Sequence, residues 1–474
     1  MKIKVSKRDI IWSYIGVMFS IGSAFLKLPF ILFFLTADEL GLWYIFLAIS
    51  GIVRLFDFGF TPTFARNIAY CWSGAEKLTK EGCVYGESKK VNYRLLKTVI
   101  STCKVQYGII SIAALLLSST LGTWYVFHVS NGLSGNDHLI AWGIFCVAIF
   151  LNLYYGYFAA LLRGVGAVSK INQAMVFSNV IQIVFSILLL YLGFGLIASA
   201  IGFLINGLLL GLLCRKYFLK YENLSNKLTQ IKEKTTKKEI IELYKIMSFN
   251  AYRDGLVSFS HFLGSQATTI ISSLFLSLTE TAIYSLSLQL INIISSVSSA
   301  LIMASHPALQ SAYINQDKIT QRKLVAKGIS LFYILYSIGV IAVILIGFPL
   351  IQLLGLDMAY NIPIFLGLSL YTFLWTQQVL FAAFISNTNR ILYMKSFLVS
   401  SVFGTIASLL LMGYFGMGLW GLIIGPGVIQ LAYNNWKWVH FFTRELDITL
   451  FELLRNGIAD WKSDVFLRVK HVKK

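Results

Sequence analysis

The sequence has 474 residues, of which 57% are hydrophobic and 13% charged, and its mean hydropathy is +0.72. Soluble proteins carry roughly 25% charged residues, so this composition excludes a soluble globular protein and predicts a polytopic membrane protein. The formal net charge of +19 is typical of nucleic-acid-binding proteins, but the placement of the charges argues against that class, as shown below. The five cysteines have no paired spacing, which predicts free thiols and no metal site.

Apolar segments of about 20 residues recur along the whole chain, and a helix of that length crosses a hydrocarbon core of ~30 Å. Helices are expected because an open strand edge would leave backbone groups without hydrogen bonds in lipid. The first segment has no cleavage site and is read as a span, not as a signal peptide. The twelve expected spans are 10–35, 41–66, 96–120, 139–162, 171–193, 195–217, 246–275, 281–305, 327–354, 361–386, 394–414 and 418–442.

The loops between these spans differ sharply in basic residues. All but four of the 40 Lys and Arg residues fall in the terminal segments and in every second loop, and the intervening loops carry none. The positive-inside rule therefore places both termini and all basic loops in the cytoplasm. The net charge is thus explained by topology, and we expect no nucleic-acid partner.

Six charged residues remain inside the expected spans: Lys27, Arg54, Asp57, Lys104, Arg253 and Asp254. An ionised side chain near the bilayer centre costs roughly 2.5–3.5 kcal/mol on insertion scales, so such residues are expected to face protein or water. Counted from Gly41, Arg54 lies about 20 Å below the outer edge of its span, a depth from which its side chain reaches an interface only with difficulty. The six charges sum to a positive value, which favours an anionic ligand. Arg54 and Asp57 are three residues apart, and the alternative is that they neutralise each other.

Small polar residues repeat at helical spacing beside these charges. The repeats are Ser13, Gly16, Ser20, Ser23 and Lys27; Ser50, Arg54, Asp57 and Thr61; Ser101, Lys104, Gly108 and Ser111; and Asp254, Ser258, His261, Ser265, Thr268 and Ser272. Two interpretations stay open for each repeat: an ordinary contact between membrane helices, or the wall of a shared hydrated cavity. His261 is interpreted either as a polar packing or cavity residue or as a proton-coupling group.

The chain also shows signs of an internal duplication. The segment "ELGLWYIFLAI" from Glu39 and the segment "ETAIYSLSLQL" from Glu280 place acidic, small, aliphatic and aromatic residues at matching positions. Both follow a short outer turn, which suggests parallel repeats related by an axis normal to the membrane. The predicted organisation is an N-terminal six-helix lobe (1–217), a basic cytoplasmic linker (218–245), a C-terminal six-helix lobe (246–443) and a basic tail (444–474).

Two stretches carry a family resemblance. "DELGLWYIFLAISGIVRLFDFGFTPTFARNIAYCWSGAEKL", from Asp38 to Leu78, resembles the first hairpin of bacterial polysaccharide flippases, the Wzx-like members of the multidrug/oligosaccharidyl-lipid/polysaccharide (MOP) exporter superfamily. Thr268 to Gln310 is similar to the start of that family's second half. The resemblance implies an all-α integral membrane protein with about twelve helices in two six-helix lobes, as in MOP and MATE transporters.

The resemblance also implies a function. Flippases of this kind carry undecaprenyl-pyrophosphate-linked repeat units of O-antigen, capsule or exopolysaccharide from the cytoplasmic to the periplasmic leaflet of the bacterial inner membrane by alternating access. They are similar in using basic residues on early helices to bind the pyrophosphate, which here corresponds to Lys27 and Arg54, with Lys104 and Arg253 as weaker matches. The expected partners are this lipid-linked oligosaccharide, membrane lipids and other polysaccharide-assembly proteins. No cofactor is expected, and a coupling ion, H+ or Na+, is left open.

Three other functions compete with this expectation. A MATE-type drug or metabolite antiporter shares the fold but calls for acidic residues in its cavity, whereas basic residues are in excess here. A polysaccharide polymerase or ligase needs a large outer loop with basic residues, and the longest outer loop, 121–138, has none. ATP-driven export by this chain alone is disfavoured because no G-x-x-x-x-G-K-[ST] loop is present. We therefore expect a transporter and not an enzyme.

Amide and aromatic side chains within spans suit sugar hydroxyls; the candidates are Asn152, Tyr154, Tyr155, Asn179, Gln182, Gln377 and Gln378. For the tyrosines, the alternative is an interface belt or helix packing.

The tail is too charged to cross the membrane. Two interpretations stay open for it: an amphipathic helix on the inner membrane surface, or an ordinary solvated basic segment.

Overall fold

The computed structural model describes residues 7–80, 82–85, 90–131, 135–233, 235–265, 267–314, 316–353, 361–386 and 392–472. The chain forms two compact units, Met1–Phe262 and Leu263–Lys474, and each is described by itself. Within the described residues, nine helices are long and apolar enough to cross a membrane. They coincide with the predicted spans other than 10–35, 246–275 and 418–442. The protein is therefore a multi-pass, almost entirely α-helical membrane protein, as its sequence predicted.

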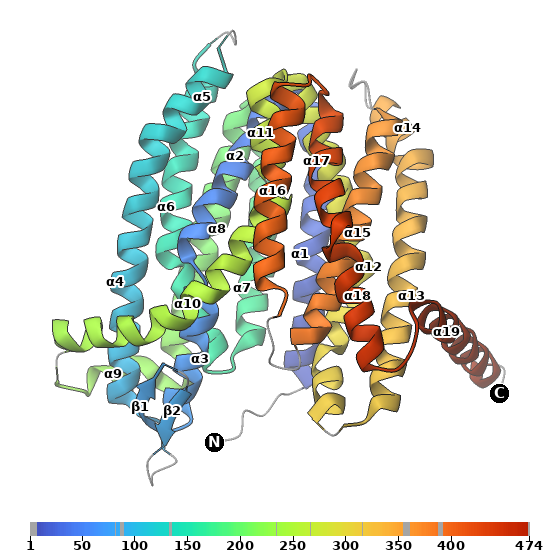
Figure 1. The fold of residues 1–474 in the computed structure, drawn as a ribbon. Coiled ribbons are helices and arrows are strands. Elements are labelled where there is room, and N and C mark those ends of the chain that lie inside the picture. Colours follow the sequence, from blue (N-terminus) through green and yellow to red (C-terminus); the bar gives the residue numbers. More distant parts are fainter. Residues whose placement is uncertain are drawn as a thin grey trace. The chain divides into compact units, whose positions relative to one another are not determined.

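Unit 1 is a helical bundle with one small hairpin (Figure 1). Its elements are α1 (Lys7–Phe34), α2 (Ala37–Arg54), the 3-10 turn η1 (Leu55–Asp57), α3 (Phe60–Trp72), β1 (Ala75–Thr79), β2 (Gly82–Tyr85), α4 (Tyr93–Leu117), the π-helical turn η2 (Ser118–Gly122), α5 (Thr123–Val129), α6 (Asp137–Gly164), α7 (Val168–Tyr191), α8 (Gly195–Lys220), the 3-10 turn η3 (Tyr221–Asn223), α9 (Leu224–Thr229) and α10 (Lys237–Ser265), whose last residues pass into unit 2.

The long helices of unit 1 pack in the order α4, α6, α8, α7 and α1. Glycines allow α8 to lie close to both neighbours: a Cβ at Gly207 would meet the side chain of Asn152 on α6, and one at Gly202 would meet Ser186 on α7. Small residues have this role in membrane proteins because lipid supplies no hydrophobic force between helices, and close packing must replace it. Asn152, one of the predicted sugar ligands, is therefore part of a helix contact.

Unit 2 is entirely helical in its described part. Its elements are α11 (Ala267–Phe275), α12 (Leu278–Ile314), α13 (Lys318–Ala342), the π-helical turn η4 (Val343–Gly347), α14 (Phe348–Leu353), α15 (Ile362–Ser386), α16 (Met394–Gly413), α17 (Leu419–Ala432), α18 (Asn434–Glu445) and α19 (Leu450–Val472). α12 packs against α13 and α15, α16 packs against α17, and α19 packs against α13. The predicted span 418–442 is wrong as a single helix, because Tyr433, with a φ of −144°, separates α17 from α18.

The same N-terminal cap starts α2 and α12, the two helices that the sequence comparison aligned. The hydroxyl of Thr36 accepts a hydrogen bond from the backbone N–H of Glu39, whose carboxylate accepts one from the backbone N–H of Thr36. Ser277 and Glu280 repeat this reciprocal pair at the start of α12. Such a capping box satisfies backbone donors that a helix start leaves free. The matching acids at Glu39 and Glu280 are therefore explained by helix starts.

The segment between α8 and α10 is held by an arginine of α4. Arg94 donates from Nε to Glu233 at 2.5 Å and from Nη2 to Glu239 at 2.7 Å.

The division between the two units lies inside α10, whereas the sequence analysis placed a linker at 218–245 and a second lobe from 246. The lobes 1–217 and 246–443 stay a prediction about the moving parts of the protein. The tail is helical over α19, and its position on the membrane surface stays a prediction.

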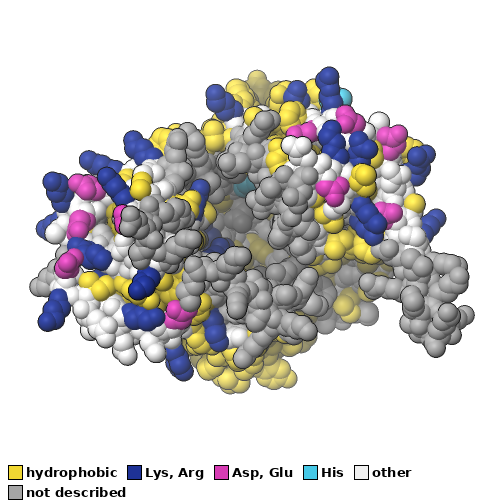
Figure 2. All heavy atoms as spheres, turned by 90° about the horizontal axis from the view of Figure 1, so that it is seen from below, with side chains coloured by type: hydrophobic (Ala, Val, Ile, Leu, Met, Phe, Trp, Pro, Cys, Tyr) yellow, Lys and Arg dark blue, Asp and Glu magenta, His cyan; other side chains and the backbone are white. Residues whose placement is uncertain are grey.

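Figure 2 shows Lys and Arg side chains together with Asp and Glu on the face seen from below. In unit 1, the hairpin and α9 lie at the lower end of the bundle in Figure 1. By the positive-inside rule, we expect the basic loops to face the cytoplasm.

Gly425 gives a test of the close contact between α16 and α17. A Cβ at Gly425 would lie 2.7 Å from the backbone nitrogen of Ser408, whereas one at Gly427 would meet nothing nearer than a Tyr371 ring carbon at 3.9 Å. We expect Gly425→Ala to lower the free energy of unfolding by about 1–3 kcal/mol through overpacking. Gly427→Ala is the matched control, because both changes bring the same gain in helix propensity. Thermal unfolding in detergent checks this, and equal midpoints for the two variants would contradict it.

Candidate functional sites

The segment "RLFDFGF" is a break between two helices. α2 ends at Arg54, η1 covers the next three residues, and α3 starts at Phe60. Phe58 and Gly59 have positive φ values of 41° and 71°. Pro62 lies in the first turn of α3 and has no N–H, so α2 could not have continued unbroken through it. The predicted span 41–66 is therefore wrong as one helix, and the repeat of Ser50, Arg54, Asp57 and Thr61 does not follow one continuous helix face.

The break places Arg54 at the end of a helix. α2 begins at Ala37, and seventeen residues of helix put Arg54 about 26 Å from its start, as the last residue of α2. Its depth in the membrane stays a prediction. Its side chain is exposed.

The carboxylate of Asp57 is bound by neighbours other than Arg54. The Tyr107 hydroxyl donates to Oδ1, and the backbone N–H of Thr61 donates to Oδ2 at 3.3 Å. The hydroxyls of Thr61 and Tyr107 lie 2.7 Å apart. Because the Tyr107 O–H already donates its hydrogen bond to Asp57, Thr61 is the donor in this second contact. The carboxylate also lies at the start of α3, where a helix dipole stabilises negative charge. The alternative of an Arg54–Asp57 ion pair is wrong in this structure.

Three of the predicted cations carry no partner among the residues that the structure describes. Lys27 on α1 is half-buried, while Arg54 on α2 and Lys104 on α4 are exposed. None of the three forms an ion pair, a hydrogen bond or a ring contact with a described residue. Within the described residues, unit 1 therefore holds three basic side chains without a counter-ion, on α1, α2 and α4, and the Asp57 carboxylate is already bound by Tyr107 and Thr61.

α10 touches the break as well. A Cβ at Gly255 would lie 2.5 Å from a ring carbon of Phe58 and 3.1 Å from its Cα, so the two backbones are in close contact. The predicted site residues Arg253 and Asp254 stand directly before Gly255, but their side chains lie outside the described ones. His261, two turns further along α10, is half-buried.

The remaining polar repeats divide between helix contacts and a cavity wall. A Cβ at Gly16 would meet Asn172 of α7 at 2.6 Å, and Ser23 is buried, so this face of α1 packs against α7. On α4, Ser111 is buried and donates to the carbonyl of Gly108. These two repeats fit the simpler interpretation of ordinary membrane helix packing.

Unit 2 contains a neutral polar cavity of about 340 Å³. It is lined by Ser265, Asn292, Ser295, Ser296, Ser299, Thr376, Val379 and Leu380. The hydroxyls of Ser296 and Ser299 donate to carbonyls one turn back on α12, which leaves their lone pairs free to accept hydrogen bonds. Apart from Ser265, the sequence analysis missed this site, although Asn292, Ser296 and Ser299 recur at helical spacing.

The amide side chains that were predicted to bind sugars mostly bind other side chains. Asn179 accepts a hydrogen bond from Asn206 at 3.1 Å. Gln377 accepts one from Tyr333, and Gln378 donates to Gln430 at 3.1 Å. Gln378 is also completely buried. Polar contacts of this kind join neighbouring membrane helices, so these amides contribute first to packing.

Cysteine labelling distinguishes the lined cavity from the buried face of the same helix. Ser296 on α12 is exposed to the neutral cavity, whereas Ser298 is 1% exposed. We expect Ser296→Cys and Ser265→Cys to react with a water-soluble maleimide in membranes, and Ser298→Cys and the buried Ser50→Cys to stay inert. The background is Cys83→Ser, because the other four native cysteines are buried. An inert Ser296→Cys would mean that this cavity is closed to water, and full labelling of Ser298→Cys would mean that the buried face of α12 is open to water.

Comparison with family models and with curated proteins gives no match to this sequence. Among solved structures, an inward-facing multidrug resistance MATE family transporter of the MOP superfamily aligns with 93% of this chain and 98% of its own, with a TM-score of 0.64 and 15% identity. An outward-facing structure of such a transporter covers 94% and 97%, with a TM-score of 0.62 and 13% identity. The chain has the MATE fold. A MATE structure in a bent conformation aligns less closely, with a TM-score of 0.53, 13% identity and coverage of 96% and 100%.

The MATE fold agrees with the fold that the resemblance implied. It extends over nearly the whole chain, whereas the sequence resemblance rests on two stretches. At 13–15% identity this likeness shows the fold alone.

Proposed function

We propose that the protein is a transporter of the bacterial cytoplasmic membrane that works by alternating access. Its cargo is an undecaprenyl-pyrophosphate-linked oligosaccharide, a repeat unit of O-antigen, capsule or exopolysaccharide, moved from the cytoplasmic to the periplasmic leaflet. The MATE fold, similar to both inward-facing and outward-facing transporters, supports the mode of transport. The chemistry of each unit supports the cargo.

The observation that carries this proposal is a set of basic side chains in unit 1 that have no counter-ion among the described residues: Lys27, Arg54 and Lys104. Phosphates are prohibitively costly to desolvate without partners, and Lys and Arg supply charge-assisted hydrogen bonds to them. Arg in addition can bind a phosphate through two N–H groups at once. In unit 2, the hydroxyls and the amide of the neutral cavity match the hydroxyls of sugars. A lipid-linked glycan needs both basic groups for its pyrophosphate and neutral polar groups for its sugars.

Reconstituted transport tests the proposal directly. Proteoliposomes are loaded with a fluorescent polyprenyl-pyrophosphate oligosaccharide, and its arrival in the opposite leaflet is followed by quenching from one side. We expect transport of this lipid and little transport of the same glycan on an uncharged polyprenol. Equal transport of both, or transport of neither, would overturn the proposal. Glycans of different composition then define the sugar specificity.

A second candidate is an ion-coupled MATE-type antiporter, which the structural similarity to multidrug resistance transporters favours. An antiporter of cationic drugs needs carboxylates inside the membrane. In unit 1, the sequence analysis identified one such acid whose side chain is described, Asp57. Because that carboxylate is occupied by Tyr107 and Thr61, we rank this candidate lower. Efflux of a cationic dye under an H+ or Na+ gradient, without lipid flipping, would reverse the order.

A further inference from the structure

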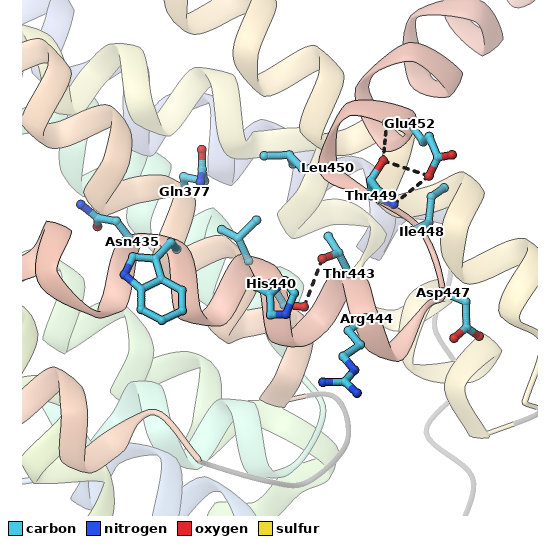
Figure 3. Close-up of a pocket in the computed structure, with 12 residues that line it drawn as sticks. Gln377, Asn435, His440, Thr443, Arg444, Asp447, Ile448, Thr449, Leu450 and Glu452 are labelled. Carbon is cyan, nitrogen blue, oxygen red and sulfur yellow. Dashed lines mark hydrogen bonds between the residues drawn. The ribbon is translucent and has the colours of Figure 1, made fainter.

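Unit 2 has a second and larger cavity, with a volume of about 560 Å³ (Figure 3). Its walls come from α15, from α18, from the connection between α18 and α19, and from the first turn of α19. The lining residues are Gln377, Asn435, Trp436, Val439, His440, Thr443, Arg444, Asp447, Ile448, Thr449, Leu450 and Glu452. Neither the transport proposal nor the comparisons assign a role to this cavity.

The cavity lies at the basic end of α18, beside the connection to α19. By the positive-inside rule, we expect this basic segment at the inner membrane surface. Trp side chains such as Trp436 are enriched at that boundary, and Arg444, two turns further along α18, is expected at the depth of lipid phosphates.

Two basic residues face the cavity without a counter-ion. Trp436, His440 and Arg444 follow each other at intervals of four residues along α18, and all three are exposed. The opposite face of α18, with Trp438 and Phe442, is buried. Neither His440 nor Arg444 forms an ion pair or a side-chain hydrogen bond with any residue in the described part of the chain.

The two acids in the lining are already engaged. Lys318 donates to Oδ2 of Asp447 at 2.8 Å, and this hydrogen bond and charge hold the pKa of Asp447 below its usual value. Glu452 accepts hydrogen bonds from the backbone N–H and the hydroxyl of Thr449, which lower its pKa in the same way. Both carboxylates are therefore ionised and held in these contacts, and the positive charge of Arg444 is left uncompensated.

One buried acceptor in the lining has no donor. Asn435 is 6% exposed, and its Oδ1 has no hydrogen-bond partner within the described residues. A buried acceptor without a donor is costly, which points to a ligand that brings an N–H or O–H group. The rest of the wall includes the apolar side chains of Val439, Ile448 and Leu450. The site thus combines a phosphate-binding end, an acceptor for a donor group and apolar walls.

We propose that this cavity binds the headgroup of an anionic phospholipid that carries hydroxyl groups, such as phosphatidylglycerol. The phosphate contacts Arg444 and His440, a headgroup hydroxyl donates to Oδ1 of Asn435, and the apolar walls receive the glycerol backbone and the first acyl carbons. A lipid fits better than a soluble phosphate because the cavity is amphipathic and lies at the membrane boundary.

The wall formed by α19 is fixed in place, so the cavity is a stable feature of unit 2. A Cβ at Gly457 would lie 2.1 Å from the carbonyl oxygen of Ala326, so α19 and α13 are in backbone contact. The indole N–H of Trp461 donates to the carbonyl of Lys327 at 3.0 Å. The site consequently joins α18 to the tail helix, and lipid binding there would stabilise both.

Native mass spectrometry of the full-length protein, titrated with phosphatidylglycerol in detergent micelles, tests the site. We expect Arg444→Gln to weaken binding about tenfold, as loss of a charge-assisted hydrogen bond predicts. Arg455→Gln on α19 is the matched control, because Arg455 is exposed but does not line the cavity, and it should bind like the wild type. Arg444→Lys should retain most of the affinity, which separates loss of charge from misfolding.

Two further comparisons distinguish the sources of the phosphate and the role of Asn435. Phosphatidylmethanol has the same phosphate without headgroup hydroxyls, so the wild type should prefer phosphatidylglycerol and Asn435→Leu should not. Inorganic phosphate and soluble glycerol phosphate should compete poorly. Unchanged phosphatidylglycerol binding in Arg444→Gln, equal binding of phosphatidylcholine, or efficient competition by inorganic phosphate would each overturn the proposal.

Discussion

Reversing the charge of Lys27 or Arg54 is expected to reduce transport of a polyprenyl-pyrophosphate oligosaccharide by about tenfold or more. Each substitution to Glu removes a charge-assisted hydrogen bond, worth roughly 1.5–3 kcal/mol, and adds repulsion between the new carboxylate and the phosphates. Neither cation stabilises the fold through an ion pair with a described residue, so the variants should still fold. The measurement is the initial rate of flipping in proteoliposomes, normalised to the amount of folded protein.

Lys216→Glu and Arg215→Glu are matched controls for these two variants. Both residues are exposed near the cytoplasmic end of α8, so these variants change the net charge equally without altering the candidate site. We expect the controls to transport at the wild-type rate. Similar losses in all four variants would indicate an effect of overall charge on topology or insertion, and full transport by both Lys27→Glu and Arg54→Glu would exclude the pair from phosphate binding.

The positions of the spans could be predicted from the sequence because the membrane imposes one length and one polarity on every crossing. Nine described helices coincide with expected spans for this reason. The breaks were harder to predict, since "RLFDFGF" differs from its surroundings by only two charges and one glycine. Gly59 and Pro62 were the residues that could have indicated the break. Glycine favours positive φ, and proline has no backbone N–H to donate, so the two together mark the end of a helix.

The candidate site was predictable only in part. Charged residues in an apolar segment can be recognised one at a time, and Lys27, Arg54 and Lys104 were recognised in this way. Their partners depend on tertiary packing: Tyr107 lies 50 residues from Asp57 in the sequence and reaches it because α4 packs beside η1. The nearest charge in sequence, Arg54, was therefore the wrong partner to expect.

The roles of the amide side chains were also hard to predict from the sequence. Gln378 and Gln430 are 52 residues apart and bind each other in the interior of unit 2, so residues that resemble sugar ligands in the sequence are used for helix packing. The serines of α12 were less conspicuous because hydroxyls at helical spacing are common in membrane helices. Only the structure separates those that line a cavity from those that are buried.

The contacts of Asp57 lead to a prediction that separates structure from substrate binding. We expect Asp57→Asn and Tyr107→Phe each to lower the free energy of unfolding by roughly 1.5–3 kcal/mol, because the hydrogen bond between them is charge-assisted and partly buried. The double variant should lose much less than the sum of the two single losses, since either change already removes the shared interaction. Unfolding in a denaturing detergent, followed by circular dichroism, measures all three variants.

Transport by the same variants then decides what Asp57 does. If the carboxylate serves to fix the break and the start of α3, each variant should transport at the wild-type rate per folded molecule, with an unchanged KM for the lipid-linked oligosaccharide. Additive losses of stability would mean that the Tyr107 contact is not made in the membrane. A raised KM in Asp57→Asn, together with unchanged stability, would instead place Asp57 beside the phosphates as a partner of Arg54. An Arg54–Asp57 ion pair at the phosphates and a purely structural role of Asp57 thus predict opposite results for Asp57→Asn.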